Sequence, residues 1–346
     1  MKIEDKKIGS NEPIFIIAEL SANHMNDFDV AVKTIEAMKE AGADAVKFQT
    51  YSPDTITIDC DNEYFQIKQG TIWDGQVLYD LYEDAYMPWE WQPKLKKIAE
   101  NLGLIVFSSP FDKTSVDFLE DMDVPAYKIA SYEITDIPLI EYVASKGKPI
   151  IISTGIASFE DIQLAIQTCL DAGNDQIAIL KCTSSYPSPF EEINLNTIPT
   201  LEEKFEVVVG LSDHTMGCEV AIAGVSLGAK IIEKHFVLDR NMDTPDSEFS
   251  MEPAEFKLMV NSIRNVEKAL GNDNFELTEK MIINQDFSRS LFVVKDMQKG
   301  EIITEDNIRS IRPGFGLHPK YLKEILGKKV NRNLKKGTPF ELNFVD

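Results

Sequence analysis

Residues 208–215 read Val208-Val209-Gly210-Leu211-Ser212-Asp213-His214-Thr215, and a similar pattern follows at 231–236 as Ile231-Ile232-Glu233-Lys234-His235-Phe236. Each stretch is a short apolar run ending in a polar cluster with a histidine, which predicts a buried strand whose carboxyl end opens into a site. Side chains from the ends of neighbouring parallel strands converge, so we expect His214 and His235 to meet on one metal ion or substrate. With Glu233 and Asp246 close by in sequence, the pair predicts a two-histidine metal site.

Length and composition indicate a globular protein. The chain has 346 residues, of which 43% are hydrophobic, enough for one large core and a smaller second domain. No apolar run approaches the ~20 residues needed to cross a bilayer, and we expect a cytoplasmic protein. The net charge of −22 disfavours nucleic acid and anionic membrane surfaces as partners. Four widely spaced cysteines without a CxxC pair predict reduced thiols rather than disulfides or a zinc knuckle.

Strand-like runs alternate with helical periodicity through most of the chain. Eight such repeats predict a closed (β/α)₈ TIM barrel, an α/β fold whose active site lies at the carboxyl ends of the strands. The alternative is a doubly wound open sheet, which usually has a glycine-rich turn after its first strand; residues 19–24 contain no glycine. The eight strand-like stretches are 14–19, 45–49, 104–107, 126–130, 149–152, 177–180, 208–215 and 231–236.

Two segments depart from this alternation. Residues 51–88, rich in aromatic residues and containing Pro53, form a connection long enough to predict a lid or wall of the site. Beyond the barrel at 1–270 and a linker at 271–282, residues 283–346 read as short strands and turns, which predicts a separate small domain. This last part holds 12 Lys and Arg against 8 Asp and Glu, or +4, so residues 1–282 carry −26 and the two parts attract each other.

Two lysines are the most informative residues of the strands. Lys47 and Lys128 each interrupt an apolar run, and a buried ammonium needs an anionic partner, so both are expected in the site. Lysines and hydroxyls gathered at one rim suit a phosphate or a phosphorylated carboxylate, although any single serine could instead cap a turn or helix. The strand-end residues are Glu19, Lys47, Ser109, Lys128, Ser131, Glu133, Ser153, Thr154, Tyr186, Ser212, His214 and His235.

The metal predicted at the two histidines is a divalent ion that acts as a Lewis acid. Two imidazole ligands suit Mn²⁺, Co²⁺ or Zn²⁺ and leave coordination positions of the ion open for substrate or water. The site lacks, however, the third protein ligand typical of catalytic zinc. His24 has no comparable partner in the sequence, and whether it belongs to the site is left open.

Eight short motifs follow one another along the chain, at 17–19, 44–49, 107–112, 127–131, 153–155, 210–214, 233–236 and 245–246. These motifs, in this order, resemble the sialic acid synthase family, and the resemblance covers nearly the whole chain. The final domain, with Ile311-Arg312-Pro313-Gly314 and Gly316, is similar to that family's antifreeze-protein-like (SAF) domain.

The resemblance implies a reaction in which phosphoenolpyruvate condenses with an open-chain sugar aldehyde and releases phosphate by C–O cleavage. One branch of the family uses a bis-acetamido, 6-deoxy sugar, namely 2,4-diacetamido-2,4,6-trideoxy-L-altrose. The chain resembles this branch most at residues 79–82, 86–91 and 182–187. Ser184 stands where the N-acetylneuraminate enzymes typically have asparagine, which puts N-acetylmannosamine in doubt. The resemblance also implies a metal, Mn²⁺ first with Co²⁺ or Mg²⁺ as alternatives, and a domain-swapped homodimer.

Roles for individual residues follow from the same resemblance. Phosphoenolpyruvate would be bound by Lys47, Ser109, Lys128, Ser131, Ser153 and Ser212. His214 and His235 would hold the metal. Glu133 would face the cationic centre that develops at C2 of phosphoenolpyruvate, with Glu19 and Lys128 beside it as catalytic groups. The sugar would be contacted by Glu19, Tyr186, Asp246 and, from the small domain of a second subunit, Arg312.

Other readings remain open on the sequence alone. N-acetylneuraminate and legionaminic acid synthases share the chemistry and differ in the sugar. A metal-dependent aldolase or isomerase would share the histidines without needing a carboxylate-phosphate pocket or Arg312. A non-catalytic sugar-binding protein would use the aromatic stretch 79–91 as a carbohydrate platform.

Overall fold

A computed structural model describes residues 1–68, 70–271 and 273–346 of the chain. The chain divides into two compact units, Met1–Gly271 and Asn272–Asp346. Each unit has a hydrophobic core of its own.

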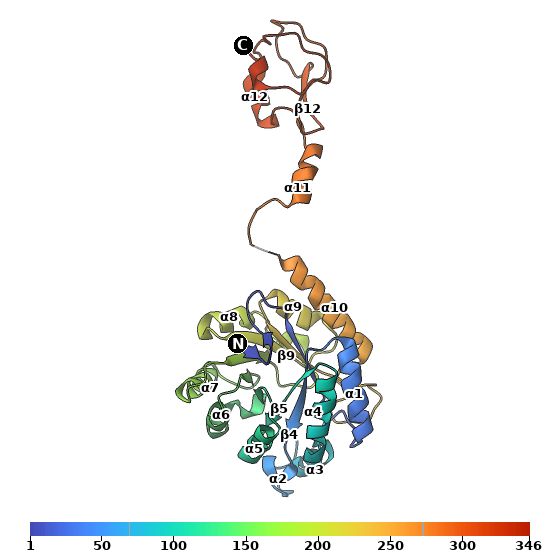
Figure 1. The fold of residues 1–346 in the computed structure, drawn as a ribbon, viewed down its shortest axis with the longest axis vertical. Helices are drawn as coiled ribbons and strands as arrows, with labels where there is room; N and C mark the ends of the chain where they lie inside the picture. The colour runs from blue at the N-terminus through green and yellow to red at the C-terminus, as the bar shows by residue number, and fades with distance from the viewer. Residues whose placement is uncertain (69, 272) are drawn as a thin grey trace. The chain divides into compact units, whose positions relative to one another are not determined.

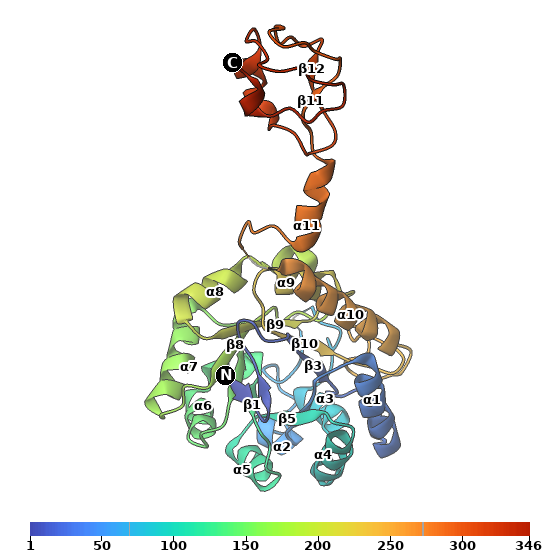
Figure 2. The same cartoon turned by 45° about the horizontal axis from the view of Figure 1, so that its top comes forward.

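The first unit is a closed barrel of eight strands, each hydrogen-bonded in parallel to its neighbours. Figure 1 shows helices ringing the strands, and Figure 2 shows the same ring after a 45° turn. This confirms the predicted TIM barrel and excludes the doubly wound sheet. The strands are β3 (Phe15–Glu19), β4 (Ala45–Thr50), β5 (Ile105–Pro110), β6 (Tyr127–Ile129), β7 (Ile150–Ser153), β8 (Ile177–Cys182), β9 (Val208–Asp213) and β10 (Ile231–His235).

The covering helices begin and end where the sequence supplies caps. Helix α1, for example, starts after Asp27, whose side chain accepts hydrogen bonds from two backbone amides of the first turn, and ends at Gly42 with φ of 97°. The barrel helices are α1 (Phe28–Ala41), α4 (Gln92–Asn101), α5 (Lys113–Asp121), α6 (Ile137–Ala144), α7 (Phe159–Asp171), α8 (Thr197–Phe205), α9 (Glu219–Ser226) and α10 (Pro253–Leu270), with 3₁₀ turns η1 (Trp89–Trp91), η2 (Ser131–Thr135) and η3 (Phe190–Glu192).

Helix α8 was not identified as a helix from the sequence. It buries Ile198 and Leu201 and leaves most of its other side chains at least partly exposed. Such a short apolar face is too weak a periodic signal to predict a helix.

Alternate residues of each strand face two different cores. Along β10, Ile231 belongs to the core inside the barrel and Ile232 to the core between barrel and helices. A hairpin of β1 (Lys2–Ile3) and β2 (Lys6–Lys7) adds Ile3 to the inner core together with Phe15, the first residue of β3. The hairpin was not predicted. By the same alternation Glu233 and His235 point inward above Ile231, which leaves only the carboxyl-terminal end of the barrel for polar groups.

The predicted wall at 51–88 contains two helices, α2 (Pro53–Ile56) and α3 (Leu78–Ala85). An isolated antiparallel bridge joins Gln66 to Val77.

The second unit is built on an antiparallel pair, β11 (Ser290–Val293) and β12 (Ile308–Ile311). Outside this pair, Ile302 forms an isolated antiparallel bridge with Lys329. Helix α11 (Glu279–Asn284) begins within the segment 271–282 that we expected to be a linker. The other short elements of the second unit are α12 (Leu322–Ile325), η4 (Gln285–Phe287), η5 (Pro319–Tyr321) and η6 (Leu342–Phe344). In the described parts of the chain, no helix combines the length and apolar character that crossing a membrane would require.

Candidate active site

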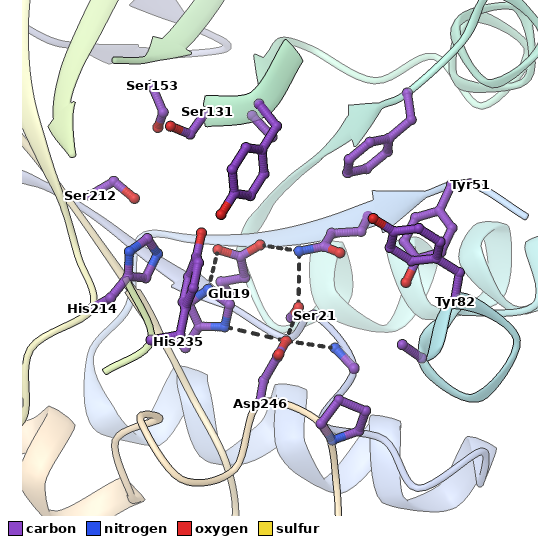
Figure 3. A pocket seen from close by; sticks show the side chains of 18 of the residues that line it. Glu19, Ser21, Tyr51, Tyr82, Ser131, Ser153, Ser212, His214, His235 and Asp246 are labelled. Carbon is purple, nitrogen blue, oxygen red and sulfur yellow. Dashed lines mark hydrogen bonds and ion pairs between the residues drawn. The ribbon is translucent and has the colours of Figure 1, made fainter. Parts of the chain in front are cut away.

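The carboxyl ends of the barrel strands surround a cavity of about 560 Å³ (Figure 3). The predicted site residues line it with the exception of Ser109, Thr154 and Arg312. The lining includes Glu19, Lys47, Lys128, Ser131, Glu133, Ser153, Tyr186, Ser212, His214, His235 and Asp246. They come from seven of the eight strands or from the loops that directly follow them, as expected for a (β/α)₈ site.

Two buried lysines and two buried carboxylates form the floor of the cavity. Lys47 Nζ lies 2.6 Å from Glu19 Oε1 and 3.7 Å from Glu233 Oε1. Lys128 Nζ lies 3.7 Å from the same Glu233 oxygen and donates to Ser153 Oγ at 2.7 Å. Burial disfavours the ammonium of Lys47, but the carboxylates of Glu19 and Glu233 outweigh it and raise the pKa of Lys47. For Lys128 burial dominates and lowers the pKa.

Glu19 is held by several groups at once. Besides Lys47, it accepts a hydrogen bond from Gln49 Nε2 at 2.9 Å, and its Oε2 lies 3.1 Å from His235 Nε2. Burial alone would raise the pKa of Glu19, but the charges of His235 and Lys47 reverse the effect and hold it far below its ordinary value. Glu19 is therefore a fixed carboxylate that orients Lys47 and His235.

The two histidines lie side by side, with ring centroids 5.3 Å apart. His214 Nδ1 lies 3.0 Å from the carbonyl oxygen of Thr183, so an Nδ1–H donating there would leave Nε2 with a free lone pair. His235 Nδ1 is buried 3.7 Å from Asp246 Oδ2 and has no hydrogen-bond partner within residues 1–68, 70–271 and 273–346. Figure 3 shows Glu19 and Asp246 flanking the His235 ring.

This donor set, imidazole nitrogens with carboxylate oxygens nearby, fits a divalent first-row ion such as Mn²⁺ or Co²⁺. Across residues 1–68, 70–271 and 273–346, no group of three or more His, Cys, Asp or Glu side chains is arranged to hold a metal. Substrate or water oxygens would therefore have to complete the shell of the two histidines.

Glu133, on η2 after β6, is the one cavity carboxylate that lacks an ion pair among the described residues. Its Oε2 is buried without a hydrogen-bond partner. Burial raises the pKa of Glu133 to about 7. A carboxyl with a pKa near neutrality can both accept and return a proton at physiological pH.

The serines differ in their surroundings. Ser212 Oγ donates to Glu233 Oε1 at 2.9 Å, and Ser131 Oγ lies 2.7 Å from Ser184 Oγ. A Cβ at Gly155 would lie within 2.3 Å of both Ser131 and Ser184 hydroxyls, so glycine is needed beside this pair.

The segment 51–88 supplies the outer wall, as the sequence predicted. Tyr51 and Tyr82 pack edge to face, and Figure 3 places them on the side of the cavity away from His214. Trp73 packs against Tyr186 with ring centroids 5.5 Å apart and donates from Nε1 to the carbonyl of Pro245 at 3.1 Å. The outer wall of the cavity is therefore mainly aromatic, whereas its floor is formed by charged side chains.

Four residues from the sequence analysis lie apart from this cavity lining. Thr154 is buried directly after β7, and its hydroxyl donates to a backbone carbonyl at the end of β8 at 3.1 Å. Ser109 is fully buried on β5, with a hydroxyl that has no partner among the described residues. Arg312 belongs to the second unit. His24 is buried against Trp91, and burial lowers its pKa to about 4, so it is a neutral packing residue.

Several lining residues received no individual role from the sequence. Glu233 was noted only as a neighbour of the predicted metal site; it shares the inward face of its strand with His235, and this i, i+2 spacing was the available signal for its place in the cavity. Ser21 and Gln49 continue the inward faces of β3 and β4 in the same way; Ser21 donates to the carboxylate of Asp246. Trp73, Cys182 and Phe249 had no periodic signal that distinguished them from core residues.

Comparison with known proteins identifies the class to which this fold and site belong. The NeuB family model matches residues 34–275, and the SAF domain model matches residues 288–345. The chain belongs to the NeuB family and ends in a SAF domain, in agreement with the resemblance noted in the sequence.

Within this family, the chain is similar along nearly its full length to pseudaminic acid synthases. It is 47% identical over 328 residues to that of Campylobacter jejuni, covering 95% of each chain, and 47% identical over 336 residues to that of Helicobacter pylori, covering 97% of this chain and 98% of the relative. An N,N'-diacetyllegionaminic acid synthase of Legionella pneumophila is 36% identical over 338 residues, or 96% of this chain and 95% of the relative. A solved spore coat polysaccharide biosynthesis protein of Bacillus subtilis is 35% identical, with a TM-score of 0.68 over 100% of this chain and 99% of that one.

Proposed function

We propose that this enzyme condenses phosphoenolpyruvate with 2,4-diacetamido-2,4,6-trideoxy-L-altrose to form pseudaminic acid, releasing phosphate. The observation that carries the proposal is the meeting of Lys47, Lys128 and several hydroxyls with the histidine pair in one buried cavity. The 47% identity to pseudaminic acid synthases, against 36% to the legionaminic acid enzyme, supports this sugar.

The lysines and serines of the barrel floor would hold phosphoenolpyruvate. Ammonium groups and hydroxyls are donors suited to phosphate and carboxylate oxygens, and burial strengthens each contact. The unpaired hydroxyl of Ser109 would gain a partner when the substrate is bound. The proposed set is Lys47, Ser109, Lys128, Ser131, Ser153 and Ser212.

His214 and His235 would hold a divalent metal, for which we propose Mn²⁺, with Co²⁺ or Mg²⁺ as alternatives. When bound, the ion would polarise the sugar aldehyde as a Lewis acid. The buried, unpaired Nδ1 of His235 and the carboxylate of Asp246 nearby support a cation at this point.

In the proposed reaction, the C2=C3 electron pair of phosphoenolpyruvate forms a bond from C3 to the aldehyde carbon. The aldehyde C=O π pair moves to its oxygen, which takes up a proton, and water adds at the cationic C2. The bond between C2 and the bridging oxygen then breaks, and phosphate leaves with that oxygen. Glu133 would stabilise the positive charge that develops at C2 and accept a proton of the attacking water. Its pKa of about 7 leaves a large fraction of the carboxylate ready to accept that proton at neutral pH.

Tyr186 and Asp246 would contact the sugar from the side of the cavity next to His235. Glu19 would join them, while its ion pair with Lys47 fixes that lysine toward phosphoenolpyruvate.

We further propose that the enzyme is a domain-swapped homodimer that acts in the cytoplasm. In this dimer, Arg312 in the small domain of one subunit would bind an acetamido group of the sugar held by the barrel of the other. The charges of −26 on residues 1–282 and +4 on residues 283–346 favour this docking.

The test is phosphate release from phosphoenolpyruvate in the presence of Mn²⁺ with three sugars: the altrose substrate, its bis-acetamido mannose analogue and N-acetylmannosamine. Release with the altrose sugar alone is the expected result. Release with another sugar would make the enzyme a legionaminic acid or N-acetylneuraminate synthase with the same chemistry. Failure with all three would favour a metal-dependent aldolase or a sugar-binding protein.

A further inference from the structure

Glu233 of β10 is the buried carboxylate that approaches both lysines of the proposed phosphoenolpyruvate site. It is 2% exposed, and its Oε1 lies 3.7 Å from Lys47 Nζ and 3.7 Å from Lys128 Nζ. The same oxygen accepts a hydrogen bond from Ser212 Oγ at 2.9 Å. Glu233 Oε2 has no hydrogen-bond partner among the described residues.

The contact between Glu233 and the lysines is one of charge rather than of hydrogen bonding. A distance of 3.7 Å exceeds the usual 2.7–3.2 Å or so of an N–H···O bond. Lys47 donates to Glu19 at 2.6 Å, and Lys128 donates to Ser153 and to the carbonyl of Ile129. Since Lys128 has no other carboxylate within ion-pair distance in the described chain, Glu233 is the group that neutralises it.

This arrangement gives the floor of the cavity a balanced charge before any substrate binds. Two ammonium groups, from Lys47 and Lys128, face two carboxylates, from Glu19 and Glu233. Without Glu233, two buried cations would repel each other with only one counter-ion between them, a costly arrangement. A bound phosphate or carboxylate, however, could neutralise the same ammonium groups.

We propose that Glu233 is an internal counter-ion that competes with the anionic ligand for Lys47 and Lys128. It holds both ammonium groups in place in the free enzyme, and it weakens the binding of inorganic phosphate so that the product can leave. The inference rests on the proposed function, because it takes the two lysines as the anion site. It assigns Glu233 a positioning role and a part in product release, not contact with the reacting atoms.

The variant Glu233→Gln tests this, because the amide oxygen can still accept from Ser212 while the charge is lost. We expect the free variant to unfold at a lower temperature than the wild type. We also expect it to bind inorganic phosphate at least about tenfold more tightly, since one unit of like charge is removed a few ångströms from the anion at an effective dielectric constant of about 20. Thermal unfolding of the full chain over a phosphate titration measures both effects.

Asp213→Asn is a matched control. Asp213 Oδ2 pairs with Lys234 Nζ at 2.7 Å, and both side chains are fully buried but neither lines the cavity. This variant should also lose stability, yet phosphate should stabilise it no more than it stabilises the wild type. If phosphate stabilised any weakened barrel in a general way, it would stabilise Asp213→Asn and Glu233→Gln alike.

The double variant Lys128→Met with Glu233→Gln removes one charge of each sign. It should regain stability relative to Glu233→Gln and lose the tightened phosphate binding. If Glu233→Gln does not fold alone, the double variant should fold. Phosphate affinity in Glu233→Gln equal to or weaker than that of the wild type, or failure of the double variant to fold, overturns the proposal. If phosphate stabilises neither the wild type nor Glu233→Gln, the phosphate pocket is refuted, and with it the proposed function.

Discussion

Replacing Glu133 with glutamine should make the protein more stable and nearly inactive, with a stability gain that depends on pH. In an unfolded chain this carboxyl has its ordinary pKa of 4.5, and burial raises the pKa to about 7 in the folded protein. The folded state therefore binds the proton more tightly than the unfolded state. Ionising Glu133 costs stability as the pH rises from about 4.5 to about 7, and the cost is constant above that range.

The size of the effect follows from the difference between these two pKa values. At about 1.36 kcal/mol per pKa unit, the wild type carries a penalty of about 3 kcal/mol at pH ~8 and about 1 kcal/mol at pH ~5.5. Glutamine has a similar shape and no charge to bury, so Glu133→Gln should remove this penalty. Turnover should fall by about 10²- to 10⁴-fold, the usual effect of losing a positioned acid or base.

Urea unfolding of wild type and variant at the two pH values measures the gain, and phosphate release measures turnover. A variant that is less stable than the wild type at pH ~8, or a gain that does not grow with pH, would refute the reasoning about the buried carboxyl. Wild-type activity should also decline below pH ~7 as Glu133 becomes protonated. An activity that stays level down to pH ~5 would show that its ionised form is not required.

Two further substitutions test the metal and sugar assignments. His235→Ala should abolish turnover while leaving far-UV circular dichroism unchanged, because it removes one of the two imidazoles proposed to bind the metal; full activity with added Mn²⁺ would contradict the assignment. Arg312→Ala should raise the KM for the sugar far more than the KM for phosphoenolpyruvate, and equal increases would place Arg312 outside the sugar pocket.

The barrel was predictable because its strands are buried on both sides. Runs such as 149–152 read as continuous apolar stretches, and each was followed by a helix-sized segment, so all eight strands could be placed from the sequence. The hairpin at residues 2–7 could not, since its strands are only two residues long and mostly lysine.

The site could be predicted from the sequence where a charged residue interrupts an otherwise apolar strand. Lys47 and Lys128 stand in apolar strands, and a buried ammonium needs an explanation. Glu233 also stands in an apolar strand, but its role as a counter-ion depends on Lys47 and Lys128, whose ammonium groups both lie 3.7 Å from its Oε1. No spacing within a single strand encodes that approach, because it arises from the closure of the barrel.

The aromatic wall marks another limit of sequence reasoning. The length of segment 51–88 indicated a wall or lid, but the position of Trp73 against Tyr186 depends on contacts between distant loops. Aromatic residues in a loop have no periodicity from which such a contact could be predicted.

The most direct test of the central claim is the fate of the bridging oxygen of phosphoenolpyruvate. With ¹⁸O placed between C2 and phosphorus, the enzyme, Mn²⁺ and the altrose sugar should release phosphate that contains the label, because the C–O bond breaks. Mass spectrometry of the phosphate and of the nine-carbon product reads the outcome. Label retained in the product, or no release of phosphate, would contradict a condensing synthase built on Lys47, Lys128 and Glu133.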